Sequence, residues 1–129
     1  MSVLIATIGQ DKESWMSVEK IISTKNFSKV FIVTNKYGHE NFNPKEISEV
    51  TIDFLVLDFN NETLKLVDEL SNGIKGIFKE EKIFDLDIAI NIASGNGKMH
   101  TIVISAVLKS GYGIRFVELD SFGKIKELI

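Results

Sequence analysis

Hydrophobic residues in this chain follow two different patterns. Short runs of Val, Ile, Leu and Phe are continuous, which is typical of parallel strands that are covered on both faces. Longer stretches place apolar side chains on one helical face, as Trp15, Val18 and Ile21 do in the first of them. Such helices are long enough to connect parallel strands. The predicted strands are residues 3–8, 29–34, 52–58 and 86–91, and the predicted helices between them are residues 12–24 and 61–78.

The remaining segments complete the predicted alternation. Residues 35–50 contain the only proline, Pro44, and predict a loop with one short helical turn near residues 44–49. A last helix is expected to begin at Asn96 or Gly97 and to end at the Ser110–Gly111 boundary, where glycine suits a C-cap. Two further strands are predicted at residues 114–119 and 124–128, and the tight turn between them makes the final strand antiparallel.

This order of elements predicts an α/β protein, a three-layer α/β/α Rossmann-like sandwich. Its sheet is expected to be mainly parallel, with about six strands and an antiparallel C-terminal hairpin strand. Ligands of such open sheets bind beyond the C-terminal ends of the strands, where the strand order reverses. The loops at residues 7–11 and 92–97 follow the first and fourth predicted strands and are therefore the candidate ligand loops.

Composition limits the class of protein. The chain has 129 residues, 44% of them hydrophobic, which predicts a single domain over residues 1–129. It contains no cysteine, which excludes disulfides and thiolate metal sites. No apolar run approaches the ~20 residues that cross a bilayer, and the first residues lack a secretion signal. We expect a soluble, cytoplasmic protein that needs no metal and no other cofactor.

Charge is distributed unevenly along the chain. The net charge of −3 argues against a protein that coats nucleic acid, and no direct DNA binding is expected. Residues 88–117 contain Lys98, Lys109 and Arg115 but no Asp or Glu, so they carry +3 and leave −6 for the remainder. This asymmetry fits a local anion site. It fits equally well a buried strand and helix that simply lack carboxylates.

The most informative segment runs from Asn91 to His100 with the sequence NIASGNGKMH. A turn of small residues before a helix presents unpaired backbone N–H groups and the positive end of the helix dipole, which together favour phosphate binding. Gly95 and Gly97 allow a positive φ or a close approach. Ser94 and Asn96 can cap the helix or bond a ligand oxygen. A helix entry that only turns and caps is the alternative interpretation.

Two common nucleotide motifs are excluded by spacing. A Walker A loop needs glycine five positions before Gly97 and a hydroxyl residue after the lysine, but the chain has Ile92 and Met99 there. The first loop has one glycine where a dinucleotide fingerprint needs three. ATP hydrolysis and NAD binding are both disfavoured.

Together these segments resemble the CARF domain, the CRISPR-associated Rossmann fold that senses cyclic oligoadenylates. The resemblance lies in the opening strand with its LIATIG sequence at residues 4–9 and in the loop and helix start at residues 90–99. Family members commonly have an Asn, small residues, glycines, a lysine and a following Met at corresponding places. The closing strand at residues 111–117 is also similar. The fold-level match covers essentially the whole chain.

The resemblance implies a homodimer in which both loops of each protomer line one two-fold symmetric pocket for the ring-shaped RNA messenger. A carboxylate there would repel phosphates, so Asp11 is expected instead to be the N-cap of the first helix. The residues that would contact the ring are Thr7, Gly9 and Gln10 from the first loop, and Ser94, Gly95, Asn96, Gly97, Lys98 and His100 from the second.

Some CARF proteins, called ring nucleases, cut the messenger slowly without metal. The substrate's own 2′-hydroxyl attacks the neighbouring phosphate, and the protein supplies positioning and charge stabilisation. Carried over, Lys98 would stabilise the developing charge, and Ser94, Thr7 or Gln10 would position the ribose. His100 is the one nearby group suited to proton transfer at neutral pH, although a histidine one turn into a helix also fits a structural place. Whether the chain is an enzyme stays open.

Other family members carry an effector domain. Arg115 is the only arginine and no histidine follows it, so an RNase module is not expected, and a stand-alone domain is predicted. The alternative function is a non-catalytic regulatory or interaction module with a vestigial pocket. An enzyme acting on another phosphorylated metabolite ranks last, because few acid–base groups lie near the loop. Trp15 is expected in the core rather than on an adenine, and His39 in a solvated turn rather than a lid.

Overall fold

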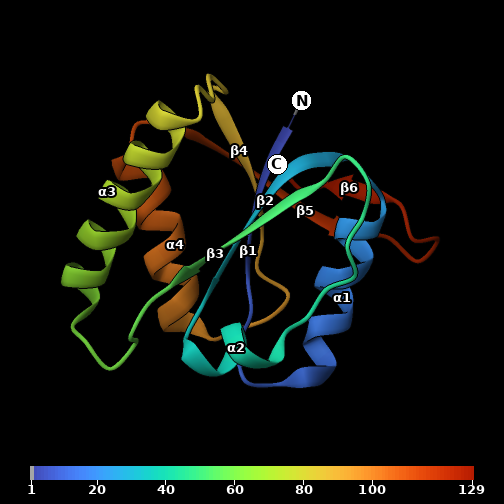
Figure 1. Ribbon diagram of the computed structural model, residues 1–129, viewed down its shortest axis with the longest axis horizontal. Coiled ribbons are helices and arrows are strands. Elements are labelled where there is room, and N and C mark those ends of the chain that lie inside the picture. Colours follow the sequence, from blue (N-terminus) through green and yellow to red (C-terminus); the bar gives the residue numbers. More distant parts are fainter. Residues whose placement is uncertain (1) are drawn as a thin grey trace.

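One six-stranded sheet forms the middle layer of the protein, in the strand order β3-β2-β1-β4-β5-β6 (Figure 1). The computed structural model describes residues 2–129. The first five strands are parallel and β6 runs antiparallel to β5. The elements are β1 (Ser2–Thr7), α1 (Lys12–Ser23), β2 (Phe27–Thr34), α2 (Lys36–Asn41), β3 (Thr51–Val56), α3 (Thr63–Glu80), β4 (Asp87–Asn91), α4 (Gly97–Lys109), β5 (Gly113–Leu119) and β6 (Ile125–Glu127).

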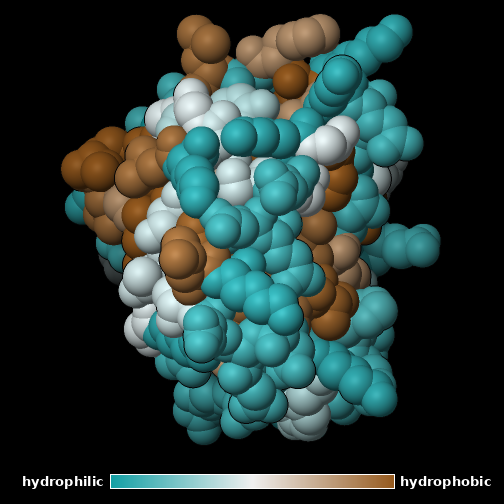
Figure 2. Space-filling model, turned by 90° about the vertical axis from the view of Figure 1, so that its left-hand side faces the viewer, coloured by the Kyte–Doolittle hydropathy of each residue, from teal (hydrophilic) through white to brown (hydrophobic). Residues whose placement is uncertain are grey.

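Each face of the sheet has its own hydrophobic core. Along β1, Val3 and Ile5 pack with α3 and α4, whereas Leu4 and Ala6 pack with α1. Alternate side chains of a strand point to opposite faces, so a strand covered on both faces has to be apolar throughout. The hydrophobic runs of the sequence are continuous because helices cover both faces of the sheet. The predicted three-layer α/β/α sandwich is confirmed. Figure 2 shows that the outer surface on the α3 side is mostly hydrophilic.

The strand order reverses between β1 and β4. The chain passes from β1 to β2 and β3 on one side, then crosses back through α3 to place β4 on the other side of β1. Open α/β sheets bind ligands outside the carboxyl ends of their strands at such a reversal, which here lies at the loops that follow β1 and β4. This is the position that the sequence predicted for the ligand loops.

The short helix between β2 and β3 was predicted in the wrong place. It is α2 (Lys36–Asn41), and residues 44–49 contain no helix. The Asn35 side chain caps its start by accepting a hydrogen bond of 2.9 Å from the Gly38 N–H. A Cβ atom at Gly38 would lie 1.8 Å from Thr34 Oγ1, so glycine lets the helix pack against the end of β2. This cap and contact, rather than Pro44, set the position of the helix.

Charged clusters fasten the outer strands. Lys29 of β2 pairs with Asp53 of β3 at 2.5 Å and with Glu81, just after α3, at 2.8 Å. Burial disfavours the charge of Lys29, but these hydrogen bonds outweigh that effect and leave the pKa of Lys29 raised. Arg115 of β5 similarly joins Asp87 of β4 and Glu127 of β6, at 2.8 and 2.6 Å.

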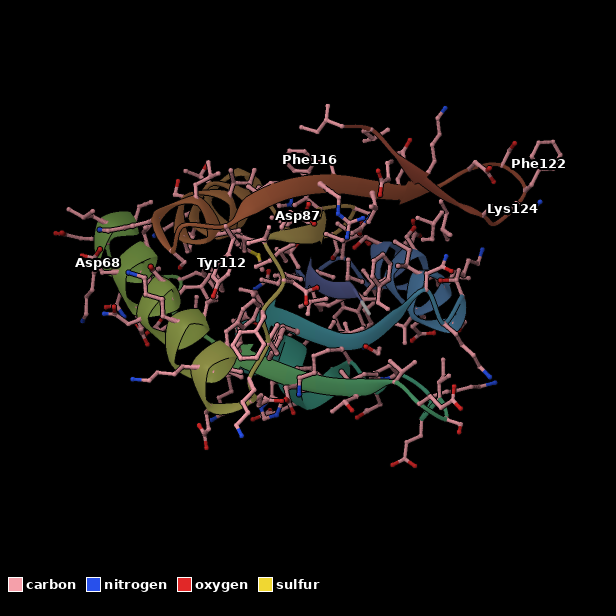
Figure 3. The ribbon with its side chains drawn as sticks, turned by 90° about the horizontal axis from the view of Figure 1, so that it is seen from above. Asp68, Asp87, Tyr112, Phe116, Phe122 and Lys124 are labelled. Atoms are coloured by element: carbon pink, nitrogen blue, oxygen red, sulfur yellow. The ribbon has the colours of Figure 1, made fainter. Side chains whose placement is uncertain are left out.

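The predicted C-terminal hairpin is confirmed. Its tip carries Phe122 and Lys124 away from the body of the protein (Figure 3). The Asp120 carboxylate accepts hydrogen bonds from the backbone N–H groups of Lys124 and Phe122, which lower the pKa of Asp120 and close the turn. Within residues 2–129, no helix has the length and apolar character needed to span a membrane.

Candidate functional site

A cleft of about 570 Å³ lies at the C-terminal ends of β1, β2, β3 and β4. The loops after β1 and β4 and helix α2, which contribute lining residues, come together at the lower end of Figure 1. This placement agrees with the rule for open α/β sheets. The lining residues are Gly9, Gln10, Asn35, Lys36, Asp58, Phe59, Asn60, Gly95, Asn96, Lys98 and Met99.

The loops after β1 and β4 touch through two glycines. A Cβ atom on Gly9 would lie 2.6 Å from the Cα of Gly95, closer than any real Cβ contact. Gly95 has φ of +100°, in the left-handed region that side chains disfavour. The prediction of a special backbone conformation at Gly95 is therefore confirmed. Glycine at both positions lets two main chains meet and form one wall of the cleft.

Ser94 fastens the same two loops from inside the protein. Its hydroxyl accepts a hydrogen bond of 2.8 Å from the Gly9 N–H and lies 2.6 Å from the Ser14 hydroxyl on α1. Its carbonyl oxygen accepts a hydrogen bond of 2.5 Å from Thr7 Oγ1. The side chains of Ser94 and Thr7 are buried and do not line the cleft. Both predicted site residues thus belong to the support of the site.

His100 and Trp15 also support these loops. His100 Nε2 lies 2.8 Å from the Ser94 carbonyl oxygen. Since a carbonyl oxygen can only accept, Nε2 must carry the hydrogen. Trp15 is buried, as predicted, and its Nε1–H donates to the Gly9 carbonyl oxygen at 2.8 Å. The two rings hold the loops in place, and neither lines the cleft.

Helix α4 begins at the cleft, as the sequence predicted. The Asn96 side chain caps it by accepting a hydrogen bond of 3.0 Å from the Met99 N–H. The first backbone N–H groups of a helix have no partner within the helix, so this end favours an anion. Gly97 has no positive φ, and a Cβ atom there would meet nothing within 4 Å, so no contact within the protein requires glycine at this position.

Lys98 connects α4 to the loop between β3 and α3. Its ammonium group donates to the carbonyl oxygens of Phe59 and Asn61, at 2.6 and 2.7 Å. An ammonium has three N–H donors, so one remains for a further acceptor. Neutral carbonyls orient the positive charge without cancelling it. Within residues 2–129, no carboxylate forms an ion pair with Lys98.

The other charged residues singled out in the sequence have structural roles. Lys109 pairs with Asp68 on α3, and Arg115 holds the β4–β5–β6 edge. Two of the three positive charges of residues 88–117 therefore form ion pairs away from the cleft. Of Lys98, Lys109 and Arg115, Lys98 alone lines the cleft. Asp11 is the N-cap of α1, as expected, and accepts a hydrogen bond of 3.1 Å from the Glu13 N–H.

Sequence reasoning missed half of the cleft. Asn35 and Lys36 follow β2, and the loop at residues 58–60 follows β3, where Asp58 Oδ1 accepts a hydrogen bond of 3.0 Å from the Asn60 N–H. The rule on strand ends applies to β2 and β3 as well as to β1 and β4. Applied to all four strands, it would have found these residues. His39 lies apart from the cleft, with its ring 4.9 Å from that of Phe54.

Comparison with known proteins identifies the fold. No protein-family model and no curated sequence matches the chain. Its structure is similar to that of Enterococcus italicus Csm6 bound to cyclic hexa-2′-fluoro-hexa-dAMP, with a TM-score of 0.62 and 14% sequence identity. The match covers 94% of this chain and 34% of the Csm6 chain, so this chain spans about a third of that protein. The fold is CARF-like, as the sequence resemblance predicted.

Proposed function

We propose that this chain binds a cyclic oligoadenylate in the cleft at the ends of β1 to β4. The observation that carries the proposal is the CARF-like fold shared with a structure solved with a cyclic oligonucleotide. The cleft adds independent chemical support, because it combines a glycine-lined wall, a helix N-terminus and the charge of Lys98. These groups suit a phosphodiester backbone.

The proposed contacts follow from what is exposed in the cleft. Phosphate oxygens would lie near the start of α4 and accept the third N–H of Lys98. Gly9 and Gly95 leave the main chain accessible where a side chain would otherwise block it. Lys36 adds a second positive charge to the lining, and Asp58 adds a negative one. The phosphates are expected at the start of α4, where the helix N-terminus and Lys98 lie together.

The size of the cleft supports a homodimer. A cavity of about 570 Å³ is in the range of sites for small, drug-sized ligands. A ring of four or more nucleotides is larger than such a ligand, so one cleft holds only part of it. A second copy related by two-fold symmetry would hold the rest, and a symmetric ring suits a symmetric receptor.

Cleavage of the ring is a separate proposal, in which Lys98 stabilises the charge that develops on the attacked phosphate. Its ammonium lines the cleft, which supports this role. Ser94 was expected to position the ribose, but its hydroxyl is buried against Gly9 and Ser14. Binding is therefore better supported than turnover.

The test measures binding, assembly and turnover on the same protein. Calorimetric titration with cyclic tetra-adenylate and cyclic hexa-adenylate is expected to show binding of at least one ring, and linear oligoadenylate of equal length is the control. Light scattering is expected to give a dimer, and chromatography of the nucleotide reports cleavage. If neither ring binds, the proposal is wrong. A stable dimer that ignores both rings would favour an interaction module instead.

A further inference from the structure

A second, shallower hollow lies directly beside the cleft. It encloses about 360 Å³ and is lined by Gln10 and Tyr37. Gln10 also lines the main cleft, so the two spaces share a wall. Tyr37 lies in the first turn of α2, next to Lys36, and the residue is 40% exposed. A ligand in the cleft can therefore extend past Gln10 onto an aromatic ring.

The Tyr37 ring is supported by aromatic side chains that reach into the core. Its centroid lies 6.1 Å from that of Trp15, and Trp15 in turn packs edge-on against the buried Phe42 at 5.7 Å. The hydrogen bond from Trp15 Nε1 to Gly9 fixes this group relative to the first loop. These aromatic contacts favour one orientation of the Tyr37 side chain. A ligand that stacks on it therefore loses little affinity to the entropy of ordering that side chain.

The charge beside this ring suits a nucleotide. The Lys12 ammonium lies 6.0 Å from the Tyr37 centroid and 5.9 Å from the Trp15 centroid. An aromatic face together with a nearby cation matches a base attached to a phosphate. Gln10 adds an amide whose oxygen and nitrogen can pair with the N6 and N7 positions of adenine.

We propose that Tyr37 is the platform on which one adenine of the bound ring stacks, and that Gln10 recognises the edge of that base. This inference rests on the proposed function and adds the part of the site that distinguishes one base from another. The phosphates would lie at α4, and the base would leave the cleft toward α2. Gln10 would then set base specificity and Tyr37 would add affinity, whereas Lys98 and the glycines would hold the backbone of any cyclic oligonucleotide.

The test compares variants with and without the aromatic ring. Tyr37→Leu keeps an apolar side chain but removes the ring, and Tyr37→Phe keeps the ring. Because stacking on an aromatic residue is worth about 1–3 kcal/mol per base, cyclic oligoadenylate affinity is expected to fall at least about fivefold in Tyr37→Leu. Tyr37→Phe should bind more tightly than Tyr37→Leu. The matched control is Tyr112→Phe, since Tyr112 packs on Phe78 in the other core.

Trp15 provides a direct readout, because it is the only tryptophan in the chain and lies next to Tyr37. Saturation with cyclic oligoadenylate is expected to change the fluorescence of Trp15 in the wild type, and to change it much less in Tyr37→Leu. Gln10→Ala should narrow the preference for cyclic oligoadenylate over cyclic oligouridylate. Wild-type affinity and fluorescence response in Tyr37→Leu would overturn the stacking proposal alone. If the wild type binds no ring, the proposed function fails as well.

Discussion

The two halves of the cleft are built differently. In the inner half, the loops after β1 and β4 meet through Gly9, Gly95 and the buried hydroxyl of Ser94. In the outer half, the loops after β2 and β3 present exposed side chains to the same space, and Lys98 connects the second of them to α4. The inner half consists of close main-chain contacts, whereas the outer half depends on a few polar bonds.

This difference indicates which half fixes the geometry. Two main chains in contact cannot move apart without breaking buried hydrogen bonds, and each orphaned donor costs about 1–3 kcal/mol. A loop held through a flexible lysine can shift by a small change in that side chain. We infer that the inner half determines where a phosphate binds, and that the outer half adapts to the shape of the rest of the ligand.

The largest effect is expected from Gly9→Ala. The new Cβ atom would lie 2.6 Å from the Cα of Gly95, so the loops must separate. Forcing an extra methyl group into a packed site typically costs about 1–3 kcal/mol, and we expect the upper end, about 3 kcal/mol, in urea unfolding. Ring binding should be lost with it.

Gly76→Ala is the matched control for Gly9→Ala. Gly76 lies in α3, where an added Cβ atom meets nothing within 4 Å. This change is expected to raise stability by about 0.5–1 kcal/mol, because alanine favours a helix over glycine. If both variants were equally stable, the inner half would not be the rigid half.

Ser94→Ala is expected to have the next largest effect. It removes the acceptor of the buried Gly9 N–H, which should lower the free energy of unfolding by about 2 kcal/mol. The control is Ser71→Ala, another buried serine, whose partner Ser110 keeps a bond of 2.7 Å to the Ala106 carbonyl oxygen. Its cost is expected to be about 1 kcal/mol, the value for one net hydrogen bond. Only Ser94→Ala should weaken the binding of cyclic oligoadenylate. An equal loss of affinity in Ser94→Ala and Ser71→Ala would contradict the prediction.

Sequence predicted the inner half because its residue types are unusual. Continuous apolar runs identified the strands, and the glycines around Ser94 identified a loop with close contacts. The outer half carries ordinary polar residues, such as Asn35 and Asn60, which acquire a role only from their place at strand ends. The position of α2 depended on a local cap at Asn35, which competed with the more conspicuous Pro44.

The orientation of hydroxyl groups was beyond sequence reasoning. Thr7 and Ser94 were expected to face a ligand, yet each hydroxyl bonds to the opposite loop. These partners are more than eighty residues apart along the chain, so no local pattern reports the contact. Lys98 was correctly expected at the cleft, but its carbonyl partners follow from the tertiary placement of the β3–α3 loop.

Lys98→Ala tests the connection between the two halves. Loss of its charge is expected to weaken ring binding about tenfold, which corresponds to about 1.4 kcal/mol. Hydrogen exchange should also become faster at residues 58–61, because the lysine no longer holds their carbonyls. Lys109→Ala, which removes a lysine at the other end of the same helix, should leave both quantities unchanged. Unaltered exchange in Lys98→Ala would mean that the outer loop is held by other contacts.

The smallest effects are expected at the two asparagine caps, one in each half. Asn96→Ala should cost about 1 kcal/mol, whereas Asn96→Asp keeps the cap and adds a charge that the helix dipole favours. Asn96→Asp is therefore expected to fold normally but to bind the ring more weakly, since its carboxylate would face the phosphates. Asn35→Asp places the same charge in the same cleft, at the cap of α2. The outer half can move away from the ligand, so Asn35→Asp should lose less affinity for the cyclic oligoadenylate than Asn96→Asp. Equal losses at the two positions would show that both halves are equally rigid.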